Sequence, residues 1–158
     1  MTTLELEHYV HRKLRFEIDL PVGLQTRTDL RGIALAAWDP QGTPATPFHT
    51  NLTVVAEQLP EPFELPAYAD RSLATQADVL LRWHLFDREE TDIGGIPAVR
   101  TLGHHSDGEL AIVAEQWRLI HDGRGWVLTA SCGALDYPGA GDIWRAVAET
   151  FRPRGSGA

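Results

Sequence analysis

The chain has 158 residues, of which 43% are hydrophobic and five are tryptophan, so it is long and apolar enough for one folded domain with a substantial core. Its formal net charge at pH 7 is −8, with no block of basic residues. This balance argues against nucleic-acid binding, which needs clustered lysine and arginine, and against binding to anionic membranes.

The N-terminal residues and the single cysteine indicate the compartment. The first twenty residues contain no apolar signal region, no small-residue cleavage site and no lipidation cysteine. No segment approaches the roughly 20 apolar residues that a membrane-spanning helix needs. Cys132 has no partner for an intramolecular disulfide and is expected to be a buried, inert thiol. We therefore expect a cytoplasmic protein.

The first half of the chain is predicted to be rich in strands. Residues 1–11 are expected to be a loosely ordered lead-in. Alternating apolar residues predict a strand over residues 14–20. A second strand, residues 32–39, is apolar on both faces and is expected in the middle of a sheet. Prolines and a glycine predict a loop over residues 40–47, and a third strand follows at residues 48–59.

The second half is predicted to begin and end with a helix. Leucines and alanines at helical spacing predict a helix over residues 67–83. The charged residues 84–92 predict an edge strand, because their charge would protect an exposed ladder. Residues 137–141 read as a loop, and Asp142 is a candidate N-cap for a closing helix. This order of elements predicts an antiparallel sheet with helices laid on it.

Residues 98–132 are predicted to form a meander of three strands joined by two tight turns. A two-residue turn at Asp107-Gly108 places Arg100 opposite Glu115. The second turn, at residues 122–125, has two or four residues, and either length leaves the same side chains facing inward. The predicted inner face contains Leu102, Val113, Trp117, Leu119, Trp126 and Leu128, and the same register sets Leu102 opposite Val113 and Ala98 opposite Trp117.

The candidate binding residues lie in this meander: Arg100, Glu115, Trp117 and His104. A charge pair among apolar neighbours would have perturbed pKa values, which is one mark of a functional site. The alternative is an ordinary cross-strand ion pair worth about 0.2–1 kcal/mol, and this simpler interpretation is favoured.

No metal site, cofactor or catalytic site is predicted. His104, His105 and Asp107 could offer ligands, but adjacent residues of a strand point to opposite faces. A third ligand would have to come from His49, His84 or His121, which the sequence does not place. The acidic side chains between residues 87 and 92 lack the spacing of a calcium-binding loop. The sequence contains no motif of a nucleotide-binding loop, a serine hydrolase or a zinc protease, so we expect no enzyme.

Four features of the chain resemble the PsbP-like fold family. Two are the segments FEIDLPVG at residues 16–23 and FHTNLTV at residues 48–54. The others are the meander, with turns before Glu109 and Trp126, and the closing helix that ends near Phe151-Arg152. The family includes the Mog Ran-binding factor, the photosystem II extrinsic subunit, DcrB-type proteins and LpqN-type lipoproteins, whose lipobox this chain lacks.

The resemblance implies an α+β fold with an antiparallel sheet of about six to seven strands and helices packed on its faces. It implies a single domain over residues 1–152 and a flexible tail over residues 153–158. Such families are mostly non-enzymatic binding or accessory proteins, and some act as chaperones for secreted proteins.

Three hypotheses about function follow. The first is a protein-binding or accessory module, because two helices cannot cover all the apolar strand faces. The second is a small-molecule-binding or isomerase-like domain with a pocket near Glu115, in which Glu115, Glu57 or His104 acts as base. The third is a homodimer that associates through edge strands or Trp144.

Overall fold

The computed structural model describes residues 4–42, 47–60 and 62–154. Its elements in chain order are β1 (Leu6–His11), β2 (Phe16–Pro21), β3 (Gln25–Leu30), β4 (Ile33–Trp38), β5 (Asn51–Gln58), α1 (Leu65–Val79), β6 (His84–Ile93), β7 (Ile96–Asp107), β8 (Leu110–His121), β9 (Arg124–Gly133), a 3-10 turn (Ala134–Asp136), α2 (Tyr137–Glu149) and β10 (Arg152–Pro153).

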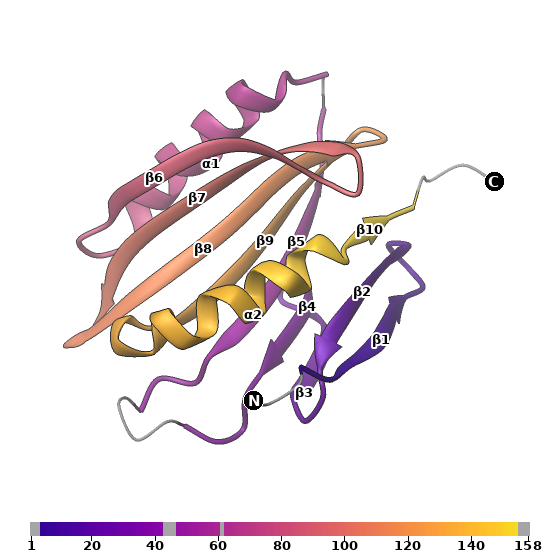
Figure 1. The fold of residues 1–158 in the computed structure, drawn as a ribbon. Coiled ribbons are helices and arrows are strands. Elements are labelled where there is room, and N and C mark those ends of the chain that lie inside the picture. The colour runs from indigo at the N-terminus through magenta and orange to yellow at the C-terminus, as the bar shows by residue number, and fades with distance from the viewer. Residues whose placement is uncertain (1–3, 43–46, 61, 155–158) are drawn as a thin grey trace.

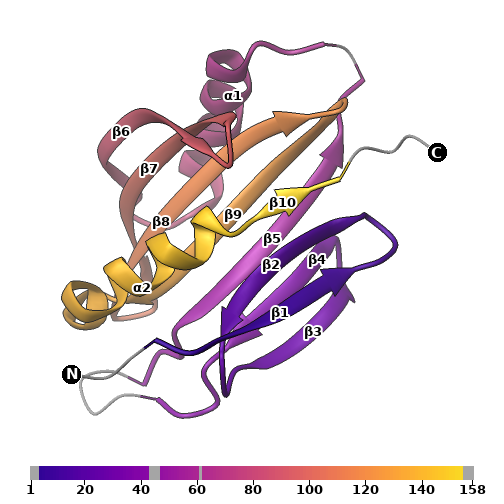
Figure 2. The same ribbon diagram turned by 45° about the vertical axis from the view of Figure 1, so that its right-hand side comes forward.

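The molecule is built on a seven-stranded antiparallel sheet in the order β3-β4-β5-β9-β8-β7-β6. One face carries α2 and a small second sheet with the order β1-β2-β10, and α1 lies on the opposite face (Figures 1 and 2). The expected α+β fold, an antiparallel sheet with helices on its faces, is therefore confirmed. No helix of the described ranges is long and apolar enough to cross a membrane.

The hydrophobic core lies between the large sheet and the layer formed by α2 and the small sheet. Trp126 is the aromatic centre of this core: its ring contacts Phe16 and Phe151 edge-on, with centroids 5.4 and 5.3 Å away. The core includes Trp117, Leu119, Trp126 and Leu128 of the predicted inner face, and Trp144 of α2. Leu102 shares this face but is only half-buried. Cys132 is buried, as expected, and burial raises the pKa of its thiol to about 11, which disfavours the reactive thiolate.

The meander forms as predicted, but the register of its first hairpin differs by two residues. The turn consists of Gly108 and Glu109, because Asp107 pairs with Leu110. Gly108 has a φ of 60°, which suits glycine at the first position of a two-residue turn. Arg100 therefore lies opposite Trp117, where Glu115 was predicted. A shift of two residues leaves each side chain on its predicted face.

The second turn has two residues, Asp122 and Gly123. Both have positive φ angles, 51° and 75°, as a type I′ turn requires. This confirms one of the two predicted turn lengths and brings Arg124 opposite His121.

The prediction of a loosely ordered lead-in is wrong for residues 6–11, whereas residues 1–3 lie outside the described ranges, and strand β3 was missed. Residues 6–11 form β1, which pairs along its whole length with β2. The missed strand β3 (QTRTDL) is exposed at all six positions, so it has no apolar alternation to detect. Both strands owe their structure to hydrogen bonds with a neighbour, which local sequence patterns do not report.

The ends of the helices also differ from the predictions. The closing helix α2 begins at Tyr137, with Pro138 in its first turn, so the predicted loop at residues 137–141 is wrong and Asp142 lies inside the helix. Proline is tolerated in the first turn because its missing N–H has no intrahelical partner there. α1 ends at Val79, earlier than predicted. The predicted edge strand is confirmed, since β6 ends the sheet and is exposed at nine of its ten positions.

Replacing Gly125 with alanine should destabilise the protein by about 1–3 kcal/mol, as overpacking does. A Cβ atom at Gly125 would lie 2.5 Å from the Tyr68 ring, which packs on it from α1. The matched control is Gly139→Ala in α2, where no atom lies within 4 Å of the added carbon. Urea unfolding of both variants measures the difference, and equal stabilities would contradict the close packing of α1 on the sheet.

The contact between β1 and β2 should depend on pH through His8. Its ring lies 2.7 Å from Asp19 and 2.9 Å from Glu17, and these carboxylates, with Asp19 the larger cause, raise the pKa of His8 above 6.5. A raised pKa stabilises the fold fully below the unfolded value, and the contribution is lost as pH rises through the folded value. His8→Ala should therefore destabilise the protein at about pH 5.5 but not at about pH 9. Chemical unfolding measures the difference in stability between the wild type and His8→Ala at each pH. A difference of the same size at both pH values would show that the contact does not depend on the charge of His8.

Candidate functional site

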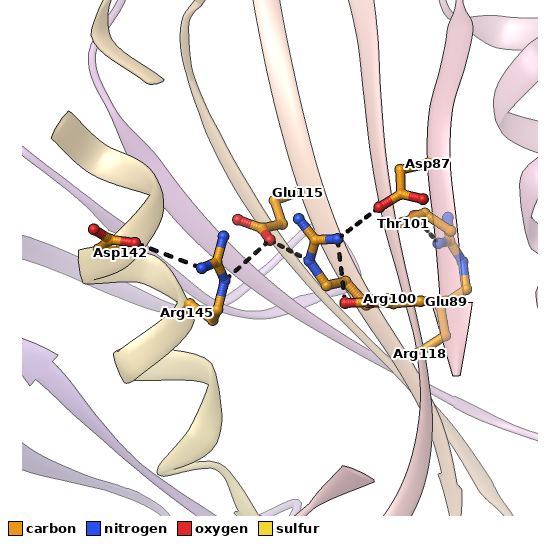
Figure 3. Close-up of polar contacts among 8 residues, drawn as sticks. All are labelled: Asp87, Glu89, Arg100, Thr101, Glu115, Arg118, Asp142 and Arg145. Atoms are coloured by element: carbon orange, nitrogen blue, oxygen red, sulfur yellow. Dashed lines mark hydrogen bonds and ion pairs between the residues drawn. The ribbon is translucent and has the colours of Figure 1, made fainter. Parts of the chain in front are cut away.

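Arg100 and Glu115 are in contact although they are not directly opposite. Arg100 Nε donates to Glu115 Oε2 across the diagonal between β7 and β8. Its Nη1 also lies 3.2 Å from Asp87 Oδ2 and 3.3 Å from Glu89 Oε1, both on the edge strand β6 (Figure 3). The Arg100 side chain is 10% exposed. One guanidinium thus joins three neighbouring strands through three carboxylates.

Glu115 connects this network to α2. Its side chain is 2% exposed, and its Oε2 lies 3.8 Å from Arg145 Nε on α2, which in turn contacts Asp142 (Figure 3). Its other oxygen, Oε1, is buried and has no hydrogen-bond partner among the described residues. Burial lowers the pKa of Arg100, but the hydrogen bond and charge of Glu115 outweigh that effect and raise it overall.

This charge network is suited to holding the edge strand β6 and helix α2 against β7 and β8. The Glu115 carboxylate is buried and bound to a guanidinium, so it is not presented to a ligand. The clefts found beside α1, beside α2, at β1 and at the β7–β8 turn are not lined by Glu115. The geometry therefore gives no support to a base at Glu115.

The other two candidate binding residues, Trp117 and His104, lie in different environments. Trp117 lies directly opposite Arg100 but is 3% exposed and belongs to the core. His104 is half-buried, opposite His84, and its ring packs against Phe86 with centroids 6.0 Å apart. Within the described ranges, no three His, Cys, Asp or Glu side chains gather closely enough to hold a metal ion.

A second polar cluster, which the sequence patterns did not predict, lies under α1 on the opposite face of the sheet. Arg118 of β8 is its centre and is fully buried. Its guanidinium donates to Ser72 Oγ at 2.8 Å, to Thr101 Oγ1 at 2.9 Å, and through Nη2 to the side-chain oxygens of Gln116 and Gln76 at 2.8 and 3.1 Å. Burial lowers the pKa of Arg118 to about 10.

The cleft beside this cluster has a volume of about 640 Å³ and lies between α1 and the sheet. Gln76 of α1 and Gln116 of β8 line it and are bonded to each other through both amide groups, at 2.9 Å each. Gln116 Nε2 also donates to Thr129 Oγ1 of β9 at 3.0 Å. The cleft therefore has a polar inner wall backed by a buried positive charge.

The cleft opens onto a part of the sheet that no helix covers. α1 packs on β7 and β8 and reaches the ends of β9 and β5 at Gly125 and Glu57, so it leaves the rest of this face of β4, β5 and β9 bare (Figures 1 and 2). The side chains on this uncovered face are half-buried at most: Ala36, Trp38, Asn51, Thr53, Val55, Val127, Thr129 and Ser131. We call these eight residues the open face.

The open face and the cluster share rows of cross-strand neighbours. Thr53 lies opposite Thr129, and Thr129 lies opposite Gln116. In the adjacent row, Val55 lies opposite Val127, which lies opposite Arg118. The available sequence signal was the pair Gln116 and Arg118, two polar residues at alternate positions of a strand that is otherwise almost wholly apolar.

Comparison with known proteins identifies the fold. No protein-family model matches the chain, and no curated protein sequence matches it. Among solved structures, PsbP (CyanoP) of Synechocystis sp. PCC 6803 superposes with a TM-score of 0.69 at 15% identity, covering 97% of this chain and 95% of that one. The chain has a PsbP-like fold.

Two other PsbP-like structures are similar over nearly their full length. LpqN, involved in cell envelope biogenesis of Mycobacterium tuberculosis, has a TM-score of 0.68 at 13% identity, with 95% of this chain and 91% of that one covered. The Ran-binding protein Mog1p of Saccharomyces cerevisiae has a TM-score of 0.67 at 8% identity, with 98% of each chain covered. Identities this low show a common fold and carry no residue-level function.

Removing Arg100 should destabilise the PsbP-like domain more than removing the pair. Arg100→Leu leaves Glu115 buried with only the distant Arg145, and uncompensated buried charges cost about 3–5 kcal/mol. The double variant Arg100→Leu/Glu115→Leu should recover much of that loss. Arg145→Ala is the control and should cost less than about 1 kcal/mol, because its side chain is nearly half exposed. Losses that simply add in the double variant, measured by urea unfolding, would contradict a coupled pair.

Proposed function

We propose that this protein is a non-enzymatic protein-binding or accessory module that holds its partner on the open face. The observation that supports the proposal is the uncovered end of the sheet, where Trp38, Val55 and Val127 present apolar surface beside threonines. A monomeric domain rarely leaves such a surface on a sheet without a use for it. The structural neighbours are consistent with this reading, since one of them is named for binding Ran.

The proposed partner is another protein, and a chaperone-like role toward a secreted protein is the finer form of the proposal. An extended or helical segment with an apolar side could lie across the strands of the open face and be shielded from water there. A second copy of this chain is the alternative occupant. The isomerase-like alternative has less support, because Glu115 is buried in its ion pair.

Thr53→Arg should abolish partner binding while leaving the fold intact. Thr53 lies in the middle of the open face, opposite Ala36 and Thr129, so a long charged side chain there would block the surface. The matched control is Thr91→Arg on the exposed edge strand β6. Tagged wild-type and variant proteins would be used to recover partners from native lysate under identical conditions, with quantification by mass spectrometry.

The proposal expects a protein that the wild type and Thr91→Arg recover and Thr53→Arg does not. Light scattering over a dilution series decides whether that protein is a second copy of this chain. Equal recovery by all three proteins, or no enriched protein at all, would overturn the proposal.

A further inference from the structure

The two buried arginines of strands β7 and β8 differ in how their charge is neutralised. Arg100 lies within ion-pair distance of three carboxylates. Arg118 is buried more deeply, and all four of its hydrogen bonds go to uncharged oxygens. Across the described ranges, no carboxylate forms an ion pair with it. A buried charge is costly unless an opposite charge approaches it, so Arg118 leaves a positive charge unbalanced beneath the cleft.

Arg118 also determines which way the neighbouring amides point. A guanidinium only donates hydrogen bonds, so the side-chain oxygens of Gln76 and Gln116 must face it and their nitrogens must face away. Gln116 Nε2 uses both hydrogens, on Gln76 and Thr129. Gln76 Nε2 uses one, on Gln116, and its second hydrogen has no acceptor in the part of the chain that the structure describes.

Thr129 supplies a second free donor. Its hydroxyl oxygen accepts from Gln116, which leaves its hydrogen available to the cleft. Gln76, Gln116 and Thr129 all line the cleft. The inner wall therefore presents N–H and O–H donors, which Arg118 polarises from behind.

The charges at the rim of the cleft do not neutralise Arg118. The carboxylate among its lining residues belongs to Glu57, which lies 2.7 Å from Arg71 of α1. That pair is neutral as a whole and half-exposed. The unbalanced charge of the site is a single positive one, which a single carboxylate would match.

We propose that the cleft binds a side-chain carboxylate of the protein partner, held by the donors of Gln76 and Thr129 with Arg118 supplying the opposite charge. The partner as source rests on the proposed function: the row from Thr129 to Thr53 and Ala36 leads from the cleft onto the open face, so a chain lying there passes the site. The anion completes the neutralisation that the fold leaves open, and it fixes the register of the partner on the sheet.

The carboxylate site can be tested with sodium acetate as the probe, before any partner is known. In ¹⁵N-labelled protein, the side-chain signals of Gln76, Gln116 and Arg118 are followed by NMR while acetate is added. A parallel titration uses sodium chloride at the same ionic strength and pH. The proposal expects shifts that saturate with acetate and not with chloride. Identical responses to both salts would overturn it.

Matched variants locate the site. Thr129→Val and Gln76→Leu should each weaken acetate binding about tenfold, the loss expected of one hydrogen bond to a charged group. Thr91→Val makes the same change as Thr129→Val on the exposed edge strand β6, and it should leave acetate binding unchanged. Arg118→Met should abolish acetate binding. If that variant does not fold, the comparison of the two threonine variants still tests the position of the site. Equal effects of the two threonine variants would overturn the placement.

Failure of this site and failure of the proposed function are distinguishable. With a recovered partner in hand, Thr129→Val should weaken its capture, and a glutamate or aspartate of the partner should be required. If Thr53→Arg abolishes capture but Thr129→Val does not, the open face binds the partner and the carboxylate site is wrong. If an acidic peptide competes with acetate no better than its neutral amide analogue, the site takes a free carboxylate and the assignment to the partner is wrong.

Discussion

The structure depends on the burial of strand β8 on both of its faces. Residues 112–119 of this strand are buried without interruption, between α2 on one side and α1 on the other. Side chains at alternate positions therefore enter two different environments. Each polar residue on the strand must find a partner inside the protein, because water cannot reach it. Both clusters described above arise from this constraint.

The two clusters meet the constraint in different ways. Toward α2, Glu115 is neutralised by Arg100, and the network extends to Arg145 and the edge strand. Such a network fixes how the elements pack, because removing one partner leaves a buried charge. Toward α1, Arg118 is solvated by hydroxyl and amide oxygens and lacks an opposite charge in the described ranges. Among the described residues, the first cluster pairs its buried arginine with carboxylates, although Glu115 Oε1 has no hydrogen-bond partner there, whereas the second has no opposite charge and retains capacity for an external anion.

The sequence patterns predicted the elements that have an apolar side, and the exposed edge strand β6 from its charge, but they missed the exposed strand β3. The meander and the inward position of Trp117 follow from alternation, and this parity survived an error of two residues in the first turn. That turn could not be placed because Gly108 can occupy either central position of a two-residue turn. Strand β3 has no buried residue, and its structure comes from pairing with β4 across the turn at Arg31-Gly32, which apolar alternation within the strand does not report.

The candidate sites show the same limit. The contact between Arg100 and Glu115 could be predicted because both residues lie near each other on one face of one hairpin. The cluster at Arg118 depends on Gln76, which is 42 residues away on a helix, so hairpin reasoning could not reach it. The sequence signal was the pair Gln116 and Arg118, two polar residues at alternate positions of a mostly apolar strand. A buried arginine needs hydrogen-bond partners inside the protein.

The length of α1 explains why part of the sheet is uncovered and why a cleft forms beside the helix. The helix has 15 residues and packs on β7 and β8, so it covers one end of a seven-stranded sheet. A sheet face left half-covered retains apolar surface, and the boundary between its covered and bare parts becomes a cleft. The inner wall of that cleft is formed where side chains of the helix and the sheet bond to each other, here Gln76 and Gln116. A partner that extends along the bare face toward α1 reaches these two side chains. The positive charge of Arg118 beneath them can therefore select a carboxylate on the partner.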